Sequence, residues 1–230
     1  MKTIEFKSAL VRATFAPNRA LDFNIGEVEL GVFGELSREL INRTLSDSLR
    51  REHLYTALVT SSEKVLVNKE AVLGEESLTR HTFTTEIDMN MLFQPNKRLR
   101  QDKFMGAGLH SHPVDFPPSP TDLTGLMYSD FEPDAVTAAF VITPRRRIVI
   151  FRGAKTPGLS RAEAAIKVGL WTRNLEERML SFDDGMMSDE DYIEMQRMAQ
   201  DAQINQIVAK YDLALFSGAL SESTVRRGLL

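Results

Sequence analysis

The sequence predicts a mixed α/β fold, with one β-sheet flanked by helices and a helical C-terminal extension. Three observations predict it. Several segments alternate apolar and polar residues as strands do, an amphipathic helix interrupts the early strands, and helical periodicity takes over after Gly153. The expected order is β, α, β, β, β, α, β, β. We assign the sheet domain to residues 1–158 and the helical extension to residues 159–230.

The first elements follow from local patterns. Residues 3–15 (TIEFKSALVRATF) alternate closely enough to predict one or two strands. Residues 24–34 alternate again and end in glycine, which indicates another strand. Residues 35–50 carry leucines at helical spacing. Residues 53–62 (HLYTALVTSS) are rich in β-branched residues, and residues 64–67 (KVLV) follow them, so both are predicted as strands.

The middle of the chain continues the sheet. Residues 81–93 (HTFTTEIDMNMLF) predict a strand, and residues 103–113 (KFMGAGLHSHP) predict a short glycine-bearing strand that stops at proline. Residues 135–143 and 147–153 predict two more strands. Arg145, Arg146 and Arg147 make a basic turn between them, and these arginines are expected to face solvent, as basic hairpin turns commonly do.

The extension is predicted to be helical from residue 160 to about residue 217. Ser160 and Ser188 are placed as helix N-caps, because a serine hydroxyl accepts a hydrogen bond from the first turn. Trp171 lies on an apolar helix face and is expected to pack the extension onto the sheet. Residues 221–230 are expected to form a frayed end.

Composition narrows the function classes. The chain is 43% hydrophobic and 26% charged with a net charge of −4, which gives no sign of a nucleic-acid or membrane partner. No cysteine is present, so cysteine-ligated zinc, iron–sulfur clusters and thiol nucleophiles are excluded. The first residues lack the apolar core of a signal peptide, and no apolar run reaches about 18 residues. We therefore predict a cytoplasmic protein.

Two of the four histidines fall in residues 108–123 (GLHSHPVDFPPSPTDL). Alternate residues of a strand share a face, so His110 and His112 project the same way. A helix that starts at Ser119 can return Asp122 toward them, which gives the open set of three ligands found in catalytic zinc sites. The alternative is purely structural, since helix capping alone explains S-P-T-D and an isolated H-x-H occurs often by chance.

The segment HSHPVDFPPSPTD resembles the signature of the JAMM (JAB or MPN-plus) zinc metallopeptidases, H-x-H-P, a loop, then S-x-x-D. That family also has a glutamate between its first long helix and the next strand, where this chain has Glu52. The order of elements over residues 28–153 is similar to the family's core. Glu86 is the alternative glutamate. One departure is visible: five residues, 114–118, separate the proline from the serine where the family has six.

The resemblance implies a JAB/MPN (cytidine-deaminase-like) sheet and a zinc ion held by His110, His112 and Asp122. It implies that Glu52 is the general base and that Ser119 donates a hydrogen bond to the oxyanion. The implied activity is hydrolysis after the C-terminus of ubiquitin or a ubiquitin-like protein, with E1-like or E2-like proteins as possible pathway partners. Two alternatives stay open: a catalytically inactive MPN scaffold, and a hydrolase of sulfur-carrier proteins or small-molecule conjugates.

Other metal chemistries fit less well. A PHP-type phosphoesterase needs more histidines than His53 and His81 can add, a zinc deaminase needs cysteines, and no H-E-x-x-H is present. His53 is expected to point to the face opposite Glu52. Asp115 lies near the motif, but zinc needs no further ligand.

Overall fold

The computed structural model of the chain describes residues 2–22, 24–73, 103–129, 135–180 and 188–230. The strands of this part are β1 Lys2–Glu5, β2 Ile25–Glu29, β3 His53–Thr60, β4 Val65–Leu73, β5 Lys103–Ser111, β6 Ala138–Ile142, β7 Arg146–Arg152, β8 Leu213–Ala219 and β9 Thr224–Arg227. They form one sheet in the order β1-β2-β9-β8-β7-β6-β5-β3-β4. β1–β2 and β5–β6 are parallel pairs and the other neighbours are antiparallel, so the predicted mixed α/β class is confirmed.

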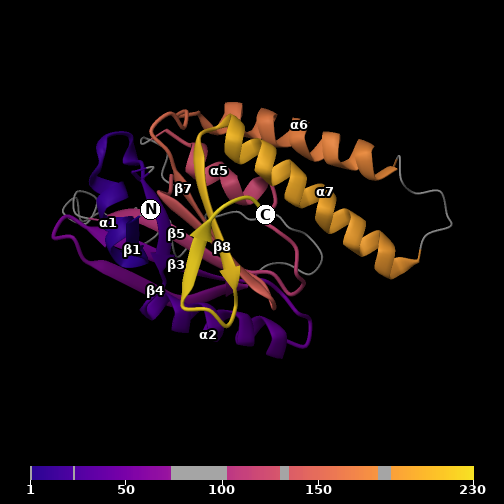
Figure 1. The fold of residues 1–230 in the computed structure, drawn as a ribbon, viewed down its shortest axis with the longest axis horizontal. Helices are drawn as coiled ribbons and strands as arrows, with labels where there is room; N and C mark the ends of the chain where they lie inside the picture. Colours follow the sequence, from indigo (N-terminus) through magenta and orange to yellow (C-terminus); the bar gives the residue numbers. More distant parts are fainter. Residues whose placement is uncertain (1, 23, 74–102, 130–134, 181–187) are drawn as a thin grey trace.

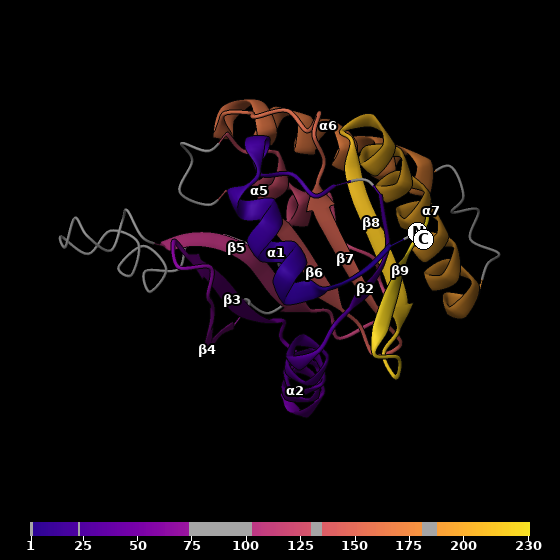
Figure 2. The same cartoon turned by 60° about the vertical axis from the view of Figure 1, so that its left-hand side comes forward.

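Helices cover both faces of this sheet (Figures 1 and 2). Their bounds are α1 Phe6–Phe15, α2 Val32–Ser46, α5 Thr124–Met127, α6 Arg161–Leu180 and α7 Asp189–Lys210, with 3-10 turns at Pro17–Arg19 and Thr121–Leu123. α1 and α2 pack on one face, and α5, α6 and α7 pack on the other. Within the described residues, no helix combines the length and apolar character needed to cross a bilayer.

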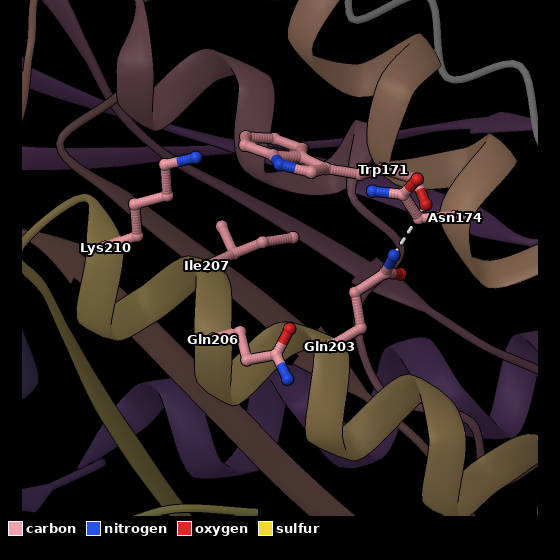
Figure 3. A pocket seen from close by; sticks show the side chains of 6 residues that line it. All are labelled: Trp171, Asn174, Gln203, Gln206, Ile207 and Lys210. Carbon is pink, nitrogen blue, oxygen red and sulfur yellow. Dashed lines mark hydrogen bonds between the residues drawn. The ribbon is translucent and has the colours of Figure 1, made fainter. Parts of the chain in front are cut away.

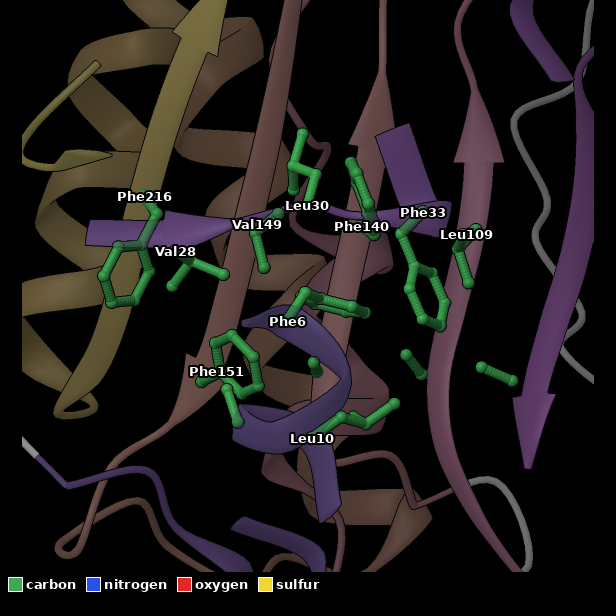
Figure 4. Packing of buried hydrophobic residues seen from close by; sticks show 14 of the residues in the cluster. Phe6, Leu10, Val28, Leu30, Phe33, Leu109, Phe140, Val149, Phe151 and Phe216 are labelled. Carbon is green, nitrogen blue, oxygen red and sulfur yellow. The ribbon is translucent and has the colours of Figure 1, made fainter. Parts of the chain in front are cut away.

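Two apolar clusters fill the space between these layers, because successive residues of the central strands face opposite ways. In β6, Phe140 packs toward α1 while Val141 packs toward α5. Figure 4 shows Phe6 and Leu10 of α1 lying over the strands of the first cluster. The Phe6 ring lies 4.6 Å from that of Phe33 and 5.4 Å from that of Phe140. Burying each such ring contributes roughly 1.5–3 kcal/mol.

The prediction of one or two strands for residues 3–15 was wrong beyond Glu5, because residues 6–15 form α1. The buried positions Phe6, Ala9, Leu10 and Ala13 recur at three- and four-residue spacing, which is the periodicity of a helix face. Polar residues between them imitated strand alternation over a short window. The start of α2 also precedes its predicted start, at Val32, directly after Gly31 with φ 53°.

The extension is helical only in part. Ser160 and Ser188 cap α6 and α7 as predicted, each accepting a hydrogen bond from a backbone N–H three residues later. The helical prediction was wrong for residues 213–217, which lie in β8, and the prediction of a frayed end for residues 221–230 was wrong where β9 forms. β8 pairs with β7 and β9 pairs with β2, so residues beyond the predicted boundary at 158 belong to the same sheet as residues before it.

The basic turn before β7 also differs from the prediction. Arg147 is fully buried rather than solvated. Its guanidinium donates to Ser37 Oγ at 2.6 Å, to the Gly34 carbonyl at 3.1 Å and to the Glu222 carbonyl. Burial lowers the pKa of Arg147 to about 10. The predicted strand over residues 81–93, with His81 and Glu86, lies outside the described residues.

Candidate metal centre

Strand alternation at the end of β5 places both predicted histidines on one face of the sheet. Leu109 packs toward α1 and α2, so His110 and His112 face the side of α5. The backbone N–H of His112 donates to the Ile142 carbonyl at 2.8 Å, which extends the pairing with β6 by one residue. Both histidines are buried. The strand therefore fixes two imidazoles beneath the surface.

A capping box brings the carboxylate to them. The backbone N–H of Asp122 donates to Ser119 Oγ at 3.3 Å, and the backbone N–H of Ser119 donates to Asp122 Oδ2 at 2.6 Å. This is the reciprocal pattern expected for S-x-x-D at a helix start. It is built on the 3-10 turn and the single turn of α5, and it leaves Asp122 fully buried against the histidines.

One possible metal-ligand atom from each of His110, His112 and Asp122 lies at this end of β5. The Nε2 atoms of His110 and His112 are 3.1 Å apart, and Asp122 Oδ2 lies 3.4 Å from the first and 3.6 Å from the second. Ligands about 2.0–2.2 Å from one tetrahedral ion lie roughly 3.3–3.6 Å from each other. The two carboxylate distances exceed the 2.7–3.2 Å typical of hydrogen bonds. The two carboxylate distances therefore match the spacing of ligands around one ion, while the two imidazole nitrogens lie slightly closer together, at a hydrogen-bond distance. These three buried residues could hold one metal ion.

The loop after β5 sets the tautomer of His112. The Phe116 carbonyl lies 3.1 Å from His112 Nδ1 and accepts its proton, which leaves Nε2 with a lone pair toward the triangle. Burial opposes protonation of His112, but the carboxylates of Asp122 and Glu52 and the Phe116 carbonyl outweigh it and raise its pKa above the ordinary value. The same negative field favours a bound cation at this point.

Glu52 reaches the site from the residue before β3. Its Oε1 lies 3.7 Å from His112 Nε2, and its side chain is 18% exposed, whereas the three candidate ligands are almost completely buried. Because Tyr55 packs toward α2, alternation along β3 turns Glu52 toward the metal face. The carboxylate therefore lies at the open side of the triangle, beside the ligands.

Ser111 and His53 occupy the opposite face, as predicted for His53. His53 Nδ1 lies 3.1 Å from Thr44 Oγ1 and 3.0 Å from the Arg51 carbonyl. Ser111 Oγ contacts the Thr44 hydroxyl and accepts from the His53 backbone N–H at 3.2 Å. These buried bonds join the end of α2 to the start of β3 and the end of β5. They hold Glu52 in register with the two histidine ligands.

The structure thus brings together His110, His112, Asp122 and Glu52, with Ser119 capping the turn that carries the aspartate. Sequence reasoning missed the groups that support them. The Phe116 contact involves a backbone carbonyl, which no side-chain pattern reveals. Thr44 lies in α2, where no sequence pattern indicates that its hydroxyl is buried. The one usable signal was the position of Ser111 between the two histidines, because alternation places its side chain on the opposite face of the strand.

A separate hollow of about 170 Å³ lies between α6 and α7 (Figure 3). Trp171 closes one side of it, with its ring 5.2 Å from that of Tyr211, and the Gln203 amide donates to the Trp171 carbonyl at 2.6 Å. Its lining contains no histidine or carboxylate, so it offers no ligand set for a metal. The lining residues are Trp171, Asn174, Gln203, Gln206, Ile207 and Lys210.

Comparison with known proteins adds no relative. No protein-family model matches the chain, and no curated protein and no solved structure matches it either.

Proposed function

We propose that this chain is a zinc-dependent hydrolase that cleaves peptide or isopeptide bonds after the C-terminus of a ubiquitin-like protein. The observation that carries the proposal is the buried triangle of His110, His112 and Asp122 with Glu52 beside it. Two imidazole nitrogens and one carboxylate oxygen form a typical ligand set of catalytic zinc, which keeps a fourth position for water or substrate. The substrate class rests on the resemblance of HSHPVDFPPSPTD to the JAMM signature.

Zinc at this position would supply Lewis-acid chemistry and lower the pKa of water from about 15.7 toward 7. His110, His112 and Asp122 hold the ion, and the buried carboxylate balances part of its charge. Glu52 accepts a proton from the attacking water and returns it to the leaving amine. Its partial exposure at the open side of the triangle suits a group that must reach both water and substrate.

Ser119 has a separate role in this proposal. Its oxygen already accepts the Asp122 backbone N–H, so the hydroxyl hydrogen remains to be donated. The side chain is half-buried, and its capping partner is one of the three residues that would hold the metal. Donation to the oxyanion that forms at the scissile carbonyl would contribute roughly 2.7–4 kcal/mol, as single donors do in comparable sites.

Two measurements on the purified full chain test the proposal. Elemental analysis after gentle purification and zinc addition should give close to one zinc per chain. A ubiquitin-like protein joined to a lysine side chain should then be cleaved at the isopeptide bond, with loss of cleavage after chelation and recovery on zinc addition. Failure to retain zinc overturns the metal centre. Zinc binding without cleavage of any ubiquitin-like conjugate supports an inactive scaffold instead.

A further inference from the structure

We propose that α7 positions the metal-binding loop through a chain of charged side chains, so that Asp201 and Arg146 control metal affinity without touching the ion. The loop concerned is residues 113–118, between the histidine ligands and Ser119. The inference rests on metal binding at His110, His112 and Asp122, but it does not depend on hydrolysis of any substrate.

The inner end of the chain is Asp115, which is not a ligand. Its Oδ1 accepts from Thr143 Oγ1 at 2.5 Å and lies 3.5 Å from Arg146 Nε. Thr143 in turn accepts from the Arg146 backbone N–H at 2.9 Å, so the β6–β7 turn is itself ordered. Asp115 directly precedes Phe116, whose carbonyl accepts from His112 Nδ1. Fixing Asp115 therefore fixes the carbonyl that orients a metal ligand.

The outer end lies on α7. Arg146 Nη2 donates to Asp201 Oδ1 at 3.1 Å, and Arg197 Nη1 donates to Asp201 Oδ2 at 2.9 Å. The side chain of Asp201 is only 11% exposed and that of Arg146 17%, so solvent screens this pair less than a surface pair. One guanidinium thus bridges the metal loop and α7. Both Nη atoms of Arg146 donate to Asp201, whereas its Nε faces Asp115 as an ion pair without a hydrogen bond.

The position of Arg146 makes it the link between this loop and α7. Arg146 lies at the first residue of β7, between two carboxylates that come from segments far apart in sequence. The Asp115 carboxylate also faces the β6–β7 turn and not the metal, which explains why it adds nothing to the ligand set. Groups that orient a ligating histidine typically change metal affinity by about 10–100-fold when removed.

The test is the zinc dissociation constant of the full chain, measured by chelator competition, with the Co²⁺ absorption spectrum as a second readout of ligand geometry. Asp115→Asn should weaken zinc binding by about 10-fold, and Asp201→Asn by about 3- to 10-fold. These effects lie at or below the lower end of the range of about 10–100-fold for groups that bond directly to a ligand, because both residues act through the Phe116 carbonyl. Asp201→Glu keeps the carboxylate and should recover most of the loss. Glu194→Gln is the matched control, because this exposed carboxylate contacts Arg197 at the far end and should leave affinity unchanged.

A double-mutant cycle separates positioning from general loosening. If Asp201 acts through Asp115, the double variant binds zinc little more weakly than Asp115→Asn alone; independent effects would multiply. Arg146→Lys is the second variant should Asp201→Asn not fold, since lysine keeps the charge but cannot bridge both carboxylates. Unchanged affinity in the folded variants, or multiplicative losses, overturns the inference. A parent chain that binds no metal overturns the proposed function as well.

Discussion

The two faces of the sheet at the end of β5 carry similar residues in two different arrangements. On the α5 side, His112 meets another imidazole and two carboxylates within 3.7 Å of its Nε2. On the α2 side, His53 meets a hydroxyl and a backbone carbonyl at 3.1 and 3.0 Å. Both rings are buried. A buried histidine is therefore a candidate ligand only where other ligand atoms converge on the same nitrogen.

The difference also shows a division of labour. Alternation along β3 and β5 sends Glu52, His110 and His112 to the metal face, while His53 and Ser111 go to the other. On that opposite face, hydrogen bonds of Thr44, His53 and Ser111 connect the same two strands to α2 without contacting the triangle of His110, His112 and Asp122. Around the end of β5, the metal face carries two carboxylates, whereas Thr44, His53 and Ser111 on the opposite face are joined by neutral hydrogen bonds. The two groups should therefore respond differently to substitution.

The largest contrast is expected between His112→Ala and His53→Ala. Removing a group that only orients a ligand typically weakens metal binding by about 10–100-fold. His112→Ala removes a ligand itself, so zinc binding should weaken by more than that. Activity should be lost with the metal. His53→Ala should instead keep the metal and lower the free energy of unfolding by roughly 1–3 kcal/mol, because the Thr44 hydroxyl and the Arg51 carbonyl lose their contacts with the buried ring. Chelator competition and urea unfolding measure both. Equal loss of zinc in the two variants would contradict the division between faces.

Glu52→Gln tests the proposed general base separately from the proposed metal ligands. Bound zinc should persist, because the three ligands are untouched, while hydrolysis should fall by about 10²–10⁴-fold. Initial rates on an isopeptide-linked conjugate measure the effect.

Two controls belong with that variant. Glu39→Gln changes a carboxylate that binds Tyr55 and Lys69 away from the metal, and it should leave the rate near that of the parent. Glu86→Gln tests the alternative base. If it abolishes turnover while Glu52→Gln does not, the assignment of the base is wrong and the metal centre stands.

A smaller effect is expected on the hydroxyl face. Thr44→Val keeps the shape of the side chain but removes the hydroxyl that contacts His53 and Ser111. The free energy of unfolding of the metal-free protein should fall by roughly 1–3 kcal/mol, while zinc affinity stays near the parent value. Thr44→Ser restores the hydroxyl and should recover much of this stability. A large loss of zinc in Thr44→Val would show that the two faces are coupled.

The elements that bear on the centre followed from sequence patterns. β3, β5, β6 and β7 were predicted because each carries a run of apolar or β-branched residues, and S-P-T-D identified the turn that holds Asp122. The face shared by His110, His112 and Glu52 follows from the two-residue period of strands, which is a geometric property of the backbone. Such features depend on a few neighbouring residues, so the sequence reveals them.

The rest depends on contacts between distant segments. β8 begins L-A-L-F, and Leu213 and Leu215 pack toward α7 while Ala214 and Phe216 pack toward α1. A strand buried on both faces has no alternation to distinguish it from the end of a helix. Arg147 was expected in solvent because its acceptors, Ser37 and two backbone carbonyls, come from α2 and the β8–β9 turn. No local pattern predicts such partners.

The smallest effect should be the pH dependence of stability, and its sign should depend on the metal. The pKa of His112 is raised in the metal-free fold, chiefly by Asp122 against the opposing effect of burial. The folded state therefore binds this proton more tightly than the unfolded state, whose pKa is about 6.5. The contribution of this proton to the free energy of unfolding is complete below about pH 6.5, the unfolded pKa. It is lost as pH rises through the folded pKa, by at most about 1.4 kcal/mol per pH unit for one proton.

Zinc reverses the sign, because a ring nitrogen that binds the ion cannot bind a proton. Acidification through the same range should weaken zinc binding and remove the stability that it adds. Urea unfolding of the metal-free and zinc-loaded protein at about pH 6–9 compares the two slopes, and His112→Ala should lack its share of the metal-free slope. Parallel slopes in both forms would mean that Nε2 of His112 does not bind the metal. The convergence of three donor atoms would then be a hydrogen-bonded cluster, like its neighbour on the opposite face.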